Sequence, residues 1–313
     1  MSPHPGAASV GWPKWLAAIA VASVVALAGL GWQSLRPVRE VRLYDDAALP
    51  PGSTVAEPVL RVVVGSMISP QSTLDRYLGL VRFLGAQVGR KGVLVQRRTY
   101  FESNQTLAST QAELGFVCTG AWLQGERQGL PLDVLAVPVV GGKSTYRAAL
   151  RVPTASAVRD LADLRGRAVA FVDALSLTGR LWLADRVRRQ GEREDRFFGR
   201  VIYAGSHDRS ILAVADGLCD AATVDDLVLE ALLAARPQLA SRIRVAEYSP
   251  PFGIPPVVAP RKLDPELRTL LTAHLLELHT QPQGVTLLAG LGVERFVLPP
   301  AGHFDSARAL PGP

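Results

Sequence analysis

Residues 170–181 read AFVDALSLTGRL, and this stretch decides how the rest of the chain is interpreted. Its first residues complete an apolar run that predicts a buried strand over residues 168–172. Asp173 ends that run, a short polar turn follows, and a helix is expected to begin near Thr178. A buried strand that leads directly into a helix is typical of an α/β fold.

Two hydroxyl side chains, Ser176 and Thr178, lie at the predicted helix start. The first N–H groups of a helix have no partner within the helix, and the helix dipole makes this end positive. The hydroxyls and the N–H groups together therefore predict a small anion-binding cradle. The alternative is that Ser176 only caps its own helix, as serine commonly does.

The composition limits the classes of protein to be considered. The chain has 313 residues, a formal net charge of +6, 48% hydrophobic residues and only 6% aromatic residues. This length predicts roughly two domains. The arginines are scattered over several predicted helices and have few aromatic neighbours, which argues against a nucleic-acid-binding surface. The basic excess indicates solubility and a general preference for anions.

No catalytic or metal-binding pattern is present. Cys118 and Cys219 lie far apart, and no Cys/His spacing predicts a zinc site, so each cysteine is expected to fill a small apolar gap. Ser176 has no nucleophile-elbow context, and there is no phosphate-binding Walker loop. We therefore expect no enzymatic activity, no cofactor and no metal.

The first part of the chain predicts export. Residues 1–35 contain an uncharged run, WLAAIAVASVVALAGLGW, at residues 15–32. Its length lies between that of an export signal and that of a membrane-spanning helix. Tryptophan at both ends favours an uncleaved membrane anchor. Residues 36–58 contain several prolines with little periodicity and are expected to form a linker.

From Leu60 onwards, strand and helix patterns alternate. The pattern begins with a strand that ends at Gly65, followed by a helix that begins at Pro70. A second strand is predicted over residues 93–100 and a third over residues 114–120. This alternation predicts a mainly parallel sheet, whose ligands gather at the carboxyl ends of the strands. Tyr100 and Thr119 are expected at such ends.

A second α/β unit begins near residue 153 and includes a helix over residues 160–167. The five prolines of residues 249–260, SPPFGIPPVVAP, argue against a helix or a central strand and indicate a crossing between lobes. The predicted organisation is one lobe from residues 59–150 and 251–313, and a second lobe from residues 151–250.

At this point the chain resembles a known family, the phosphate, phosphite and phosphonate substrate-binding proteins of ABC transporters. The resemblance rests on motifs in matching order: MISP at residues 67–70, Tyr100, FVCTGAW at 116–122, Tyr146, residues 160–179, residues 205–226 and SPPFGIPPVV at 249–258. It covers about Leu60 to Phe296. It implies a two-lobed type II periplasmic binding protein fold that holds an oxyanion between the lobes.

The resemblance also implies which residues hold the oxyanion. A buried tetrahedral anion needs several hydrogen-bond donors, because an unpaired buried charge is very unfavourable. The implied ligand-binding residues are Tyr100, Thr119, Tyr146, Ser176, Leu177, Thr178, His207 and Asp225. Each has a structural alternative: strand-end packing for the tyrosines, helix capping for His207, and a solvated turn or helix cap for Asp225.

The chain departs from the family pattern in ways that bear on the ligand. Members that bind aminoalkyl phosphonates place carboxylates at the positions of Leu227 and Pro255, so a smaller oxyanion is expected here. Leu177 replaces a hydroxyl residue in the helix-start turn. A second branch of the family senses arsenite through a cysteine in the cleft, and Cys118 lies at a comparable place.

The sequence thus predicts an exported protein that captures phosphite, phosphate or a small phosphonate for an ABC transporter permease. The alternative is a membrane-anchored sensory protein that binds a phosphorus oxyanion or arsenite and signals to a histidine kinase. Both place the protein in the periplasm. In the second it is also attached to the inner membrane through residues 15–32.

Overall fold

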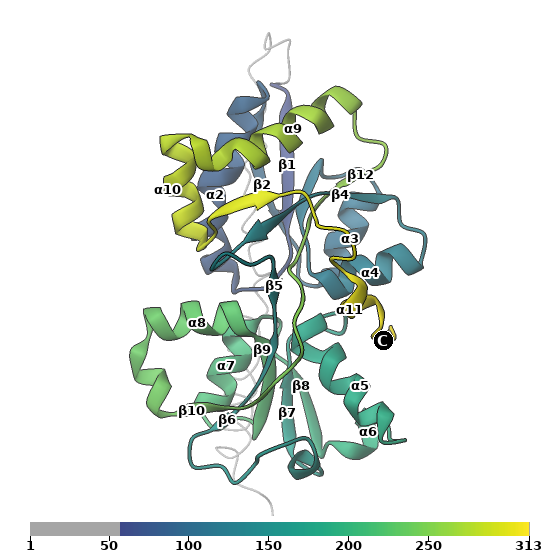
Figure 1. The fold of residues 1–313 in the computed structure, drawn as a ribbon, viewed down its shortest axis with the longest axis vertical. Helices are drawn as coiled ribbons and strands as arrows, with labels where there is room; N and C mark the ends of the chain where they lie inside the picture. Colours follow the sequence, from purple (N-terminus) through teal and green to yellow (C-terminus); the bar gives the residue numbers. More distant parts are fainter. Residues whose placement is uncertain (1–56, 313) are drawn as a thin grey trace, which may run out of the picture. The chain divides into compact units, whose positions relative to one another are not determined.

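The structure, a computed structural model, describes residues 57–312. The predicted anchor at residues 15–32 and nearly all of the predicted linker lie outside the described residues. The described part contains two large β-sheets, each with helices on both faces, which form the two lobes seen one above the other in Figure 1, and one two-stranded sheet. The exact residues at which the chain divides into lobes stay a prediction.

The first lobe is built on a six-stranded mixed sheet with the order β13-β4-β12-β3-β1-β2. Strand β1 pairs in parallel with β2 and β3, whereas β12 runs antiparallel to β3 and β4, and β13 antiparallel to β4. The strands are β1 (Val59–Val64), β2 (Lys91–Gln96), β3 (Leu114–Phe116), β4 (Leu132–Val139), β12 (Val257–Pro260) and β13 (Arg295–Val297).

The second lobe is built on a five-stranded sheet with the order β10-β6-β9-β7-β8. Its parallel part joins β7 to β8 and β9, and its antiparallel part adds β6 and β10. The strands are β6 (Ala148–Pro153), β7 (Ala168–Phe171), β8 (Arg200–Tyr203), β9 (Ala221–Asp225) and β10 (Ile243–Tyr248). The predicted mainly parallel sheets are therefore mixed in both lobes.

Helices cover both faces of each sheet (Figure 1). The first lobe carries α2 (Pro70–Gln87), α3 (Tyr100–Ala108), α4 (Thr119–Arg127), α9 (Pro265–Glu277), α10 (Pro282–Leu291) and α11 (Asp305–Arg308). The second lobe carries α5 (Trp182–Arg189), α6 (Glu194–Phe197), α7 (His207–Ala215) and α8 (Asp226–Ala235). Shorter turns are η1 (Ala162–Leu164), η2 (Leu177–Leu181), η3 (Pro237–Ser241) and η4 (Leu278–Thr280).

Several helix starts have clear local causes. Pro70 occupies the first position of α2, as predicted, where the missing N–H of proline removes nothing from the helix. Thr99 and Glu102 form a reciprocal capping box at the start of α3. These caps decide where the helices begin, and therefore which residues lie at the first turns that face the other lobe.

Two predicted strand ends proved to be helix starts. Tyr100 was expected at the end of the second strand, but β2 ends at Gln96 and Tyr100 is the first residue of α3. Thr119 was expected at the end of the third strand, but β3 ends at Phe116 and Thr119 begins α4. The capping box explains the first correction, because it draws Thr99 and Tyr100 into the helix start.

The proline-rich stretch was also misjudged. Residues 257–260 form β12, a central strand between β4 and β3, although the sequence argued against a central strand there. The strand is possible because Pro255 and Pro256 precede it and Pro260 is its last residue, so the prolines fall at its ends. In addition, the helix expected over residues 160–167 is only the short turn η1.

The chain passes between the lobes at two neighbouring places. Strand β5 (Thr145–Tyr146) lies on the first passage and β11 (Phe252–Gly253) on the second, and the two pair antiparallel.

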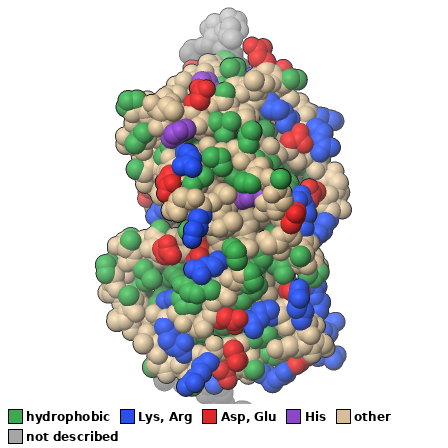
Figure 2. Space-filling view, viewed as in Figure 1, with side chains coloured by type: hydrophobic (Ala, Val, Ile, Leu, Met, Phe, Trp, Pro, Cys, Tyr) green, Lys and Arg blue, Asp and Glu red, His purple; other side chains and the backbone are tan. Residues whose placement is uncertain are grey.

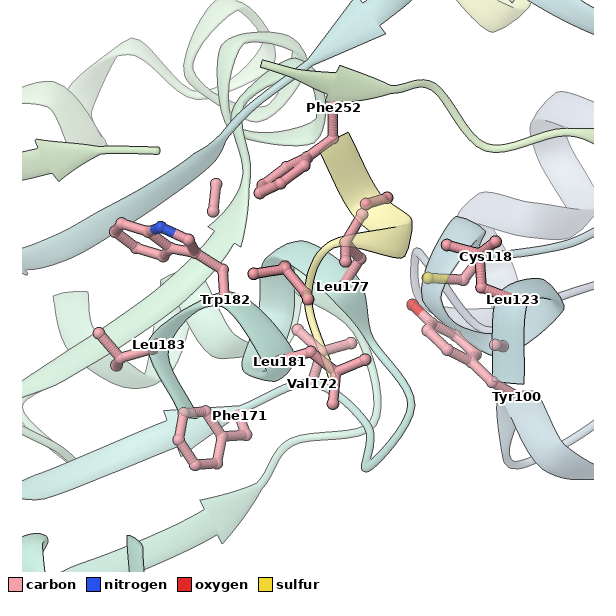
Figure 3. Packing of buried hydrophobic residues seen from close by; sticks show 14 of the residues in the cluster. Tyr100, Cys118, Leu123, Phe171, Val172, Leu177, Leu181, Trp182, Leu183 and Phe252 are labelled. Carbon is pink, nitrogen blue, oxygen red and sulfur yellow. The ribbon is translucent and has the colours of Figure 1, made fainter. Parts of the chain in front are cut away.

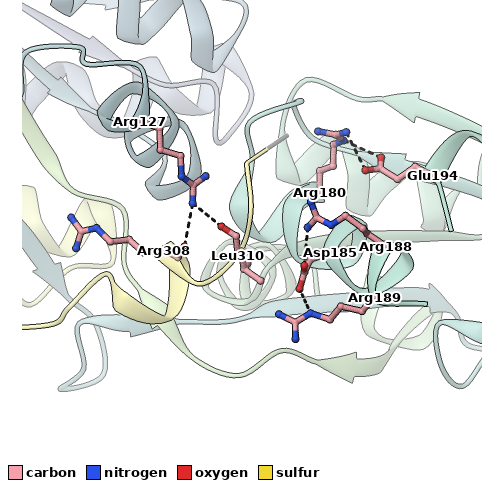
Figure 4. A network of polar contacts seen from close by, with 8 residues as sticks. All are labelled: Arg127, Arg180, Asp185, Arg188, Arg189, Glu194, Arg308 and Leu310. Carbon is pink, nitrogen blue, oxygen red and sulfur yellow. Dashed lines mark hydrogen bonds and ion pairs between the residues drawn. The ribbon is translucent and has the colours of Figure 1, made fainter. Parts of the chain in front are cut away.

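The C-terminal segment packs beside these crossing strands. Arg127 donates to the carbonyls of Arg308, at 3.2 Å, and Leu310, at 2.7 Å (Figure 4). Nearby in the second lobe, Arg180 binds Glu194, and Asp185 binds two arginines of α5.

One apolar cluster continues from the first lobe into the second. It contains Tyr100, Cys118 and Leu123 together with residues from the second lobe such as Leu177 and Trp182 (Figure 3). Two further clusters, one in each lobe, lie on the opposite faces of the two sheets. The shared cluster means that the lobes are held in contact by buried side chains.

Among residues 57–312, none of the helices combines the length and the apolar character that crossing a bilayer requires. This finding does not reach residues 15–32.

Two glycines of α10 provide a test of the packing. A Cβ at Gly284 would lie 1.9 Å from the carbonyl oxygen of Leu278, whereas a Cβ at Gly290 would meet nothing within 4 Å. We expect Gly284→Ala to lower the free energy of unfolding by about 1–3 kcal/mol, as overpacking does. Gly290→Ala should raise it by up to about 1 kcal/mol, because alanine favours a helix. Urea denaturation measures both, and equal effects would contradict this packing.

Candidate functional site

Two buried tyrosines define the candidate site. Tyr100 is 1% exposed and Tyr146 is 2% exposed, and neither phenol oxygen has a hydrogen-bond partner among the described residues. A buried polar atom without a partner is unfavourable, so such atoms need an explanation. The two phenols come from different parts of the fold, α3 and the crossing strand β5.

Tyr100 is held at the boundary between the lobes. Its backbone N–H donates to Oδ2 of Asp173, 3.1 Å away in the other lobe. Burial raises the pKa of the phenol well above its ordinary value, and Cys118 and Asp173 add to the increase. The hydroxyl of Ser176 acts in the opposite direction. Tyr100 is therefore a neutral donor that points towards the start of η2, as Figure 3 also shows.

Tyr146 lies among hydroxyl groups from both lobes. Burial raises the pKa of its phenol well above the ordinary value, with Cys118 and Asp225 adding to the increase, while the hydroxyls of Thr119 and Thr178 lower it. These hydroxyls are near, and Thr119 donates its own proton to the carbonyl of Gly253 at 3.0 Å. Neither threonine makes a hydrogen bond with the Tyr146 oxygen, which has no partner within the described residues.

The starts of two helices meet in this region. Ser176 precedes η2, and its Oγ accepts the N–H of Gly179 at 3.1 Å. From the other lobe, the first turn of α4 approaches so closely that a Cβ at Gly120 would lie 2.5 Å from the carbonyl oxygen of Leu175 and 2.9 Å from the nitrogen of Leu177. The positive ends of the two helices are thus adjacent, which creates an electrostatic environment that favours an anion.

Cys118 is the residue immediately before α4 and lies between these helix starts. Its Sγ is 4.0 Å from the carbonyl oxygen of Leu175. Burial raises the pKa of the thiol to about 11, although the N–H groups of Leu177, Ala121 and Gly120 act to lower it. The thiol is therefore protonated at neutral pH. It lies near both phenols, since it contributes to the pKa of each.

His207 and Asp225 form a linked pair at one side of Tyr146. Nδ1 of His207 accepts the backbone N–H of Asp225 at 3.0 Å. Burial lowers the pKa of His207 to about 3, so the ring is neutral. Because Nδ1 is the acceptor, the proton must be on Nε2, and His207 offers one N–H donor.

Asp225 serves as the cap of α8. Its Oδ1 accepts the N–H groups of Leu227 at 2.8 Å and Val228 at 3.1 Å. Burial raises the pKa of the carboxyl to about 7, and the neighbouring Asp226 adds to the increase, while the capping N–H groups lower the pKa. Asp225 is therefore partly protonated at neutral pH.

The fold gathers the predicted site residues at the boundary between the lobes. All of the predicted site residues are buried. Asp225 is 6% exposed, and the others are at most 2% exposed: Tyr100, Thr119, Tyr146, Ser176, Leu177, Thr178 and His207. The structural alternatives also hold in part, because Ser176 and Asp225 do cap their helices. Which of these residues contacts a ligand stays a prediction.

Two contributors were overlooked in the sequence. Asp173 was recognised only as a strand breaker, yet it receives the N–H groups of Tyr100 and Leu175. Gly120 was recognised only as part of a turn, yet the two helix starts can meet only because it has no side chain. A conspicuous acidic residue directly after a buried strand was the available signal for Asp173. Among residues 57–312 no cluster of His, Cys, Asp and Glu could hold a metal ion.

Comparisons with known proteins agree with one another. Residues 62–301 match the family model described as "ABC transporter, phosphonate, periplasmic substrate-binding protein". A phosphate-import protein, PhnD, of Mycolicibacterium smegmatis is 27% identical over 192 residues, which is 58% of this chain and 60% of that protein. The chain thus spans only about 60% of the length of this curated relative.

Solved structures show the same fold. The binding component of a phosphonate ABC transporter from Pseudomonas aeruginosa has a TM-score of 0.71 and 20% identity, covering 77% of this chain and 81% of the other. PhnD1 of Prochlorococcus marinus, solved with methylphosphonate, has a TM-score of 0.71 and 19% identity, covering 80% and 96%. The predicted type II periplasmic binding protein fold is confirmed.

The carboxyl of Asp225 should make stability depend on pH. Its pKa is about 7 in the folded protein against an ordinary 3.8, so the folded state holds a proton that the unfolded chain releases. This carboxyl therefore destabilises the fold increasingly as the pH rises from about 4 to about 7. We expect Asp225→Asn to stabilise the protein by roughly 2 kcal/mol more at pH 8 than at pH 5.

Urea denaturation at both pH values measures the effect. Asp225→Ser is the matched control, since serine also caps helices and carries no charge. It should remove the same pH dependence. A pH dependence identical in wild type and both variants would contradict the raised pKa.

Proposed function

Because the chain belongs to the periplasmic substrate-binding protein family of phosphonate ABC transporters, we propose that it captures a phosphorus oxyanion for an importer. The anion would bind at the buried site around Tyr100 and Tyr146, which we call the tyrosine cluster. The chain is a substrate-binding protein and not an enzyme. The family is periplasmic, and membrane attachment through residues 15–32 belongs to the sensory alternative described below. The candidate ligands are phosphite, phosphate and small phosphonates, and relatives are described as importing phosphate or were solved with methylphosphonate.

The observation that carries the proposal is the pair of unpartnered buried phenol oxygens beside two helix starts. A tetrahedral anion placed there would receive hydrogen bonds from both phenols, from helix N–H groups and from Nε2 of His207. These donors are neutral, so they bind the anion without a buried lysine or arginine charge. Each phenol would also gain the partner that it lacks within the described residues.

Asp225 would distinguish protonated anions from fully ionised ones. Phosphate carries a P–OH group in both of the forms present near neutral pH, and phosphite and phosphonates carry one as monoanions. This group can donate a hydrogen bond to a carboxylate. Sulfate has no proton to donate, so its oxygen would be repelled by the ionised carboxylate of Asp225 and would be accepted only by the protonated carboxyl. Because the pKa of Asp225 is about 7, the site is expected to select phosphorus oxyanions over sulfate above neutral pH, where the carboxyl is ionised.

Ligand entry requires the lobes to separate. The cluster residues are almost completely buried, and contacts between the lobes close the site on several sides. The backbone N–H of His207 donates to the carbonyl of Met67 at 3.0 Å, and the backbone N–H of Ser69 donates to Oδ2 of Asp208 at 3.2 Å. We propose that binding follows a hinge motion about the crossings that contain β5 and β11.

A second candidate function follows from Cys118. Its thiol lies near both phenols and beside two helix starts, where a trivalent arsenic centre could bind sulfur. In this alternative the protein is a membrane-anchored sensor that signals to a histidine kinase.

Arsenite binding separates the two candidates. If the site binds phosphorus oxyanions, we expect the Kd of Cys118→Ser for methylphosphonate to lie within about threefold of the wild-type value. Neither the wild type nor the variant should then bind arsenite. Cys118→Ala is the matched control for the lost thiol. Calorimetry showing tight arsenite binding that both variants abolish would instead support the sensor.

The phosphorus-oxyanion site is tested by removing single donors. We expect Tyr146→Phe and His207→Ala each to weaken phosphite or methylphosphonate binding by about 1–3 kcal/mol, since a buried anion would lose one hydrogen bond. Isothermal titration calorimetry with phosphite, phosphate, methylphosphonate and sulfate provides the measurement. Tyr203→Phe, at a 53% exposed position, is the control and should bind like wild type. Indifference of the wild-type protein to all four anions would refute the proposal.

A further inference from the structure

A groove of about 570 Å³ lies between the lobes next to the cluster. The carboxyl ends of three strands reach it: Val64 of β1, Phe116 of β3 and Asp225 of β9. Helix α8 of the second lobe forms one side, and residues of α2 form the other. In Figure 2 the surface is indented between the two lobes. A volume in the range of about 300–1,000 Å³ is typical of small-molecule sites.

The groove shares its walls with the tyrosine cluster. Asp225 lines the groove and is near enough to Tyr146 to raise the pKa of its phenol. Gly65 also lines the groove, and a Cβ there would lie 3.8 Å from the ring of Tyr100. Ile254 lines it as well, directly after Gly253, whose carbonyl binds Thr119. A group attached to an anion in the cluster could therefore extend past Asp225 into the groove.

The walls of the groove are mainly apolar. Tyr77 and Phe116 form an aromatic wall, with ring centroids 5.2 Å apart in an edge-to-face arrangement. Leu227, Val228 and Ala231 of α8 line the opposite side. Charged side chains also border the groove: Arg76, Asp208, Glu230 and Arg236.

The groove offers apolar side chains close to the cluster. Leu227, two residues after Asp225, and Pro255, next to Ile254, both line the groove and carry no charge. The carboxyl of Asp208 is already engaged, because it accepts hydrogen bonds from Ser69, Ser206 and Arg209. Asp225 is assigned to the headgroup in the proposed function, and Glu230 is exposed to solvent. The walls next to the cluster therefore suit hydrocarbon better than an ammonium group.

We propose that the groove holds a hydrocarbon substituent on phosphorus, so that the ligand is a phosphonate with a branched alkyl or aromatic group. This inference rests on the proposed function, since the cluster must hold the phosphonate headgroup. Phosphate and phosphite lack a substituent and would leave the groove unused. An aromatic ring could pack against the edge-to-face pair of Tyr77 and Phe116.

Calorimetry with a graded series of ligands tests the inference. The series is phosphite, methylphosphonate, propylphosphonate, phenylphosphonate and 2-aminoethylphosphonate. Each methylene buried in an apolar site should raise affinity about fourfold. We expect phenylphosphonate to bind at least tenfold more tightly than methylphosphonate, and 2-aminoethylphosphonate to bind more weakly than propylphosphonate.

A variant that fills the groove locates the effect. Ala231→Trp places a large side chain in the groove and leaves the cluster residues unchanged. It should lower phenylphosphonate affinity at least tenfold and change methylphosphonate affinity less than threefold. Val285→Trp, at a 52% exposed position on α10, is the matched control and should bind the whole series like wild type.

The outcomes separate this inference from the proposed function. If methylphosphonate binds but phenylphosphonate binds no more tightly, or if Ala231→Trp affects both ligands equally, the inference is wrong and the headgroup site stands. If no member of the series binds, the proposed function itself fails. A wild-type dimer that Ala231→Trp converts to a monomer would assign the groove to a second copy of the chain and overturn the inference.

Discussion

The close contact between two helix starts is the constraint on which the site depends. Gly120 of the first lobe lies against the turn that contains Leu175 and Leu177 of the second lobe, and no residue with a Cβ fits there without displacement. This contact brings together the N–H groups of both helix starts, the thiol of Cys118 and the two phenols. It also joins the lobes, because the apolar cluster around it contains residues from both. In the proposed function, a captured ligand would therefore contact the same surface that joins the lobes.

The electrostatic character of the site follows from burial. The groups nearest to the phenols are neutral or acidic, and burial keeps the tyrosines, Cys118 and His207 uncharged at neutral pH. Positive potential comes from helix ends rather than from lysine or arginine. Asp225 is the exception, because its pKa of about 7 makes both its protonated and its ionised form accessible at neutral pH. The form that it adopts would depend on whether a bound oxyanion carries a proton. Such a site would recognise the protonation state of its ligand as well as its shape.

Residue patterns predicted much of the fold and part of the site. The strand before Asp173 and the helix starting at Pro70 were found where the periodicity indicated. Predictions failed where a local cap or a sheet partner outweighed the pattern. Tyr100 follows an apolar run, but the capping box of Thr99 and Glu102 places it in a helix. Residues 257–260 follow several prolines, yet pairing with β3 and β4 makes them a central strand.

The sequence by itself determined that hydroxyl residues lie at a helix start, because residue types and spacing act over a few positions. The order of the two tyrosines and the role of His207 came from the family resemblance, and the lack of a catalytic or metal-binding set was an expectation. Only the tertiary structure decided that the two phenols lack partners, that Asp173 reaches Tyr100 from the other lobe and that Asp225 borders an apolar groove. The physical reason is that burial and electrostatic shifts depend on residues far apart in the chain, which only the packing of the two lobes brings together.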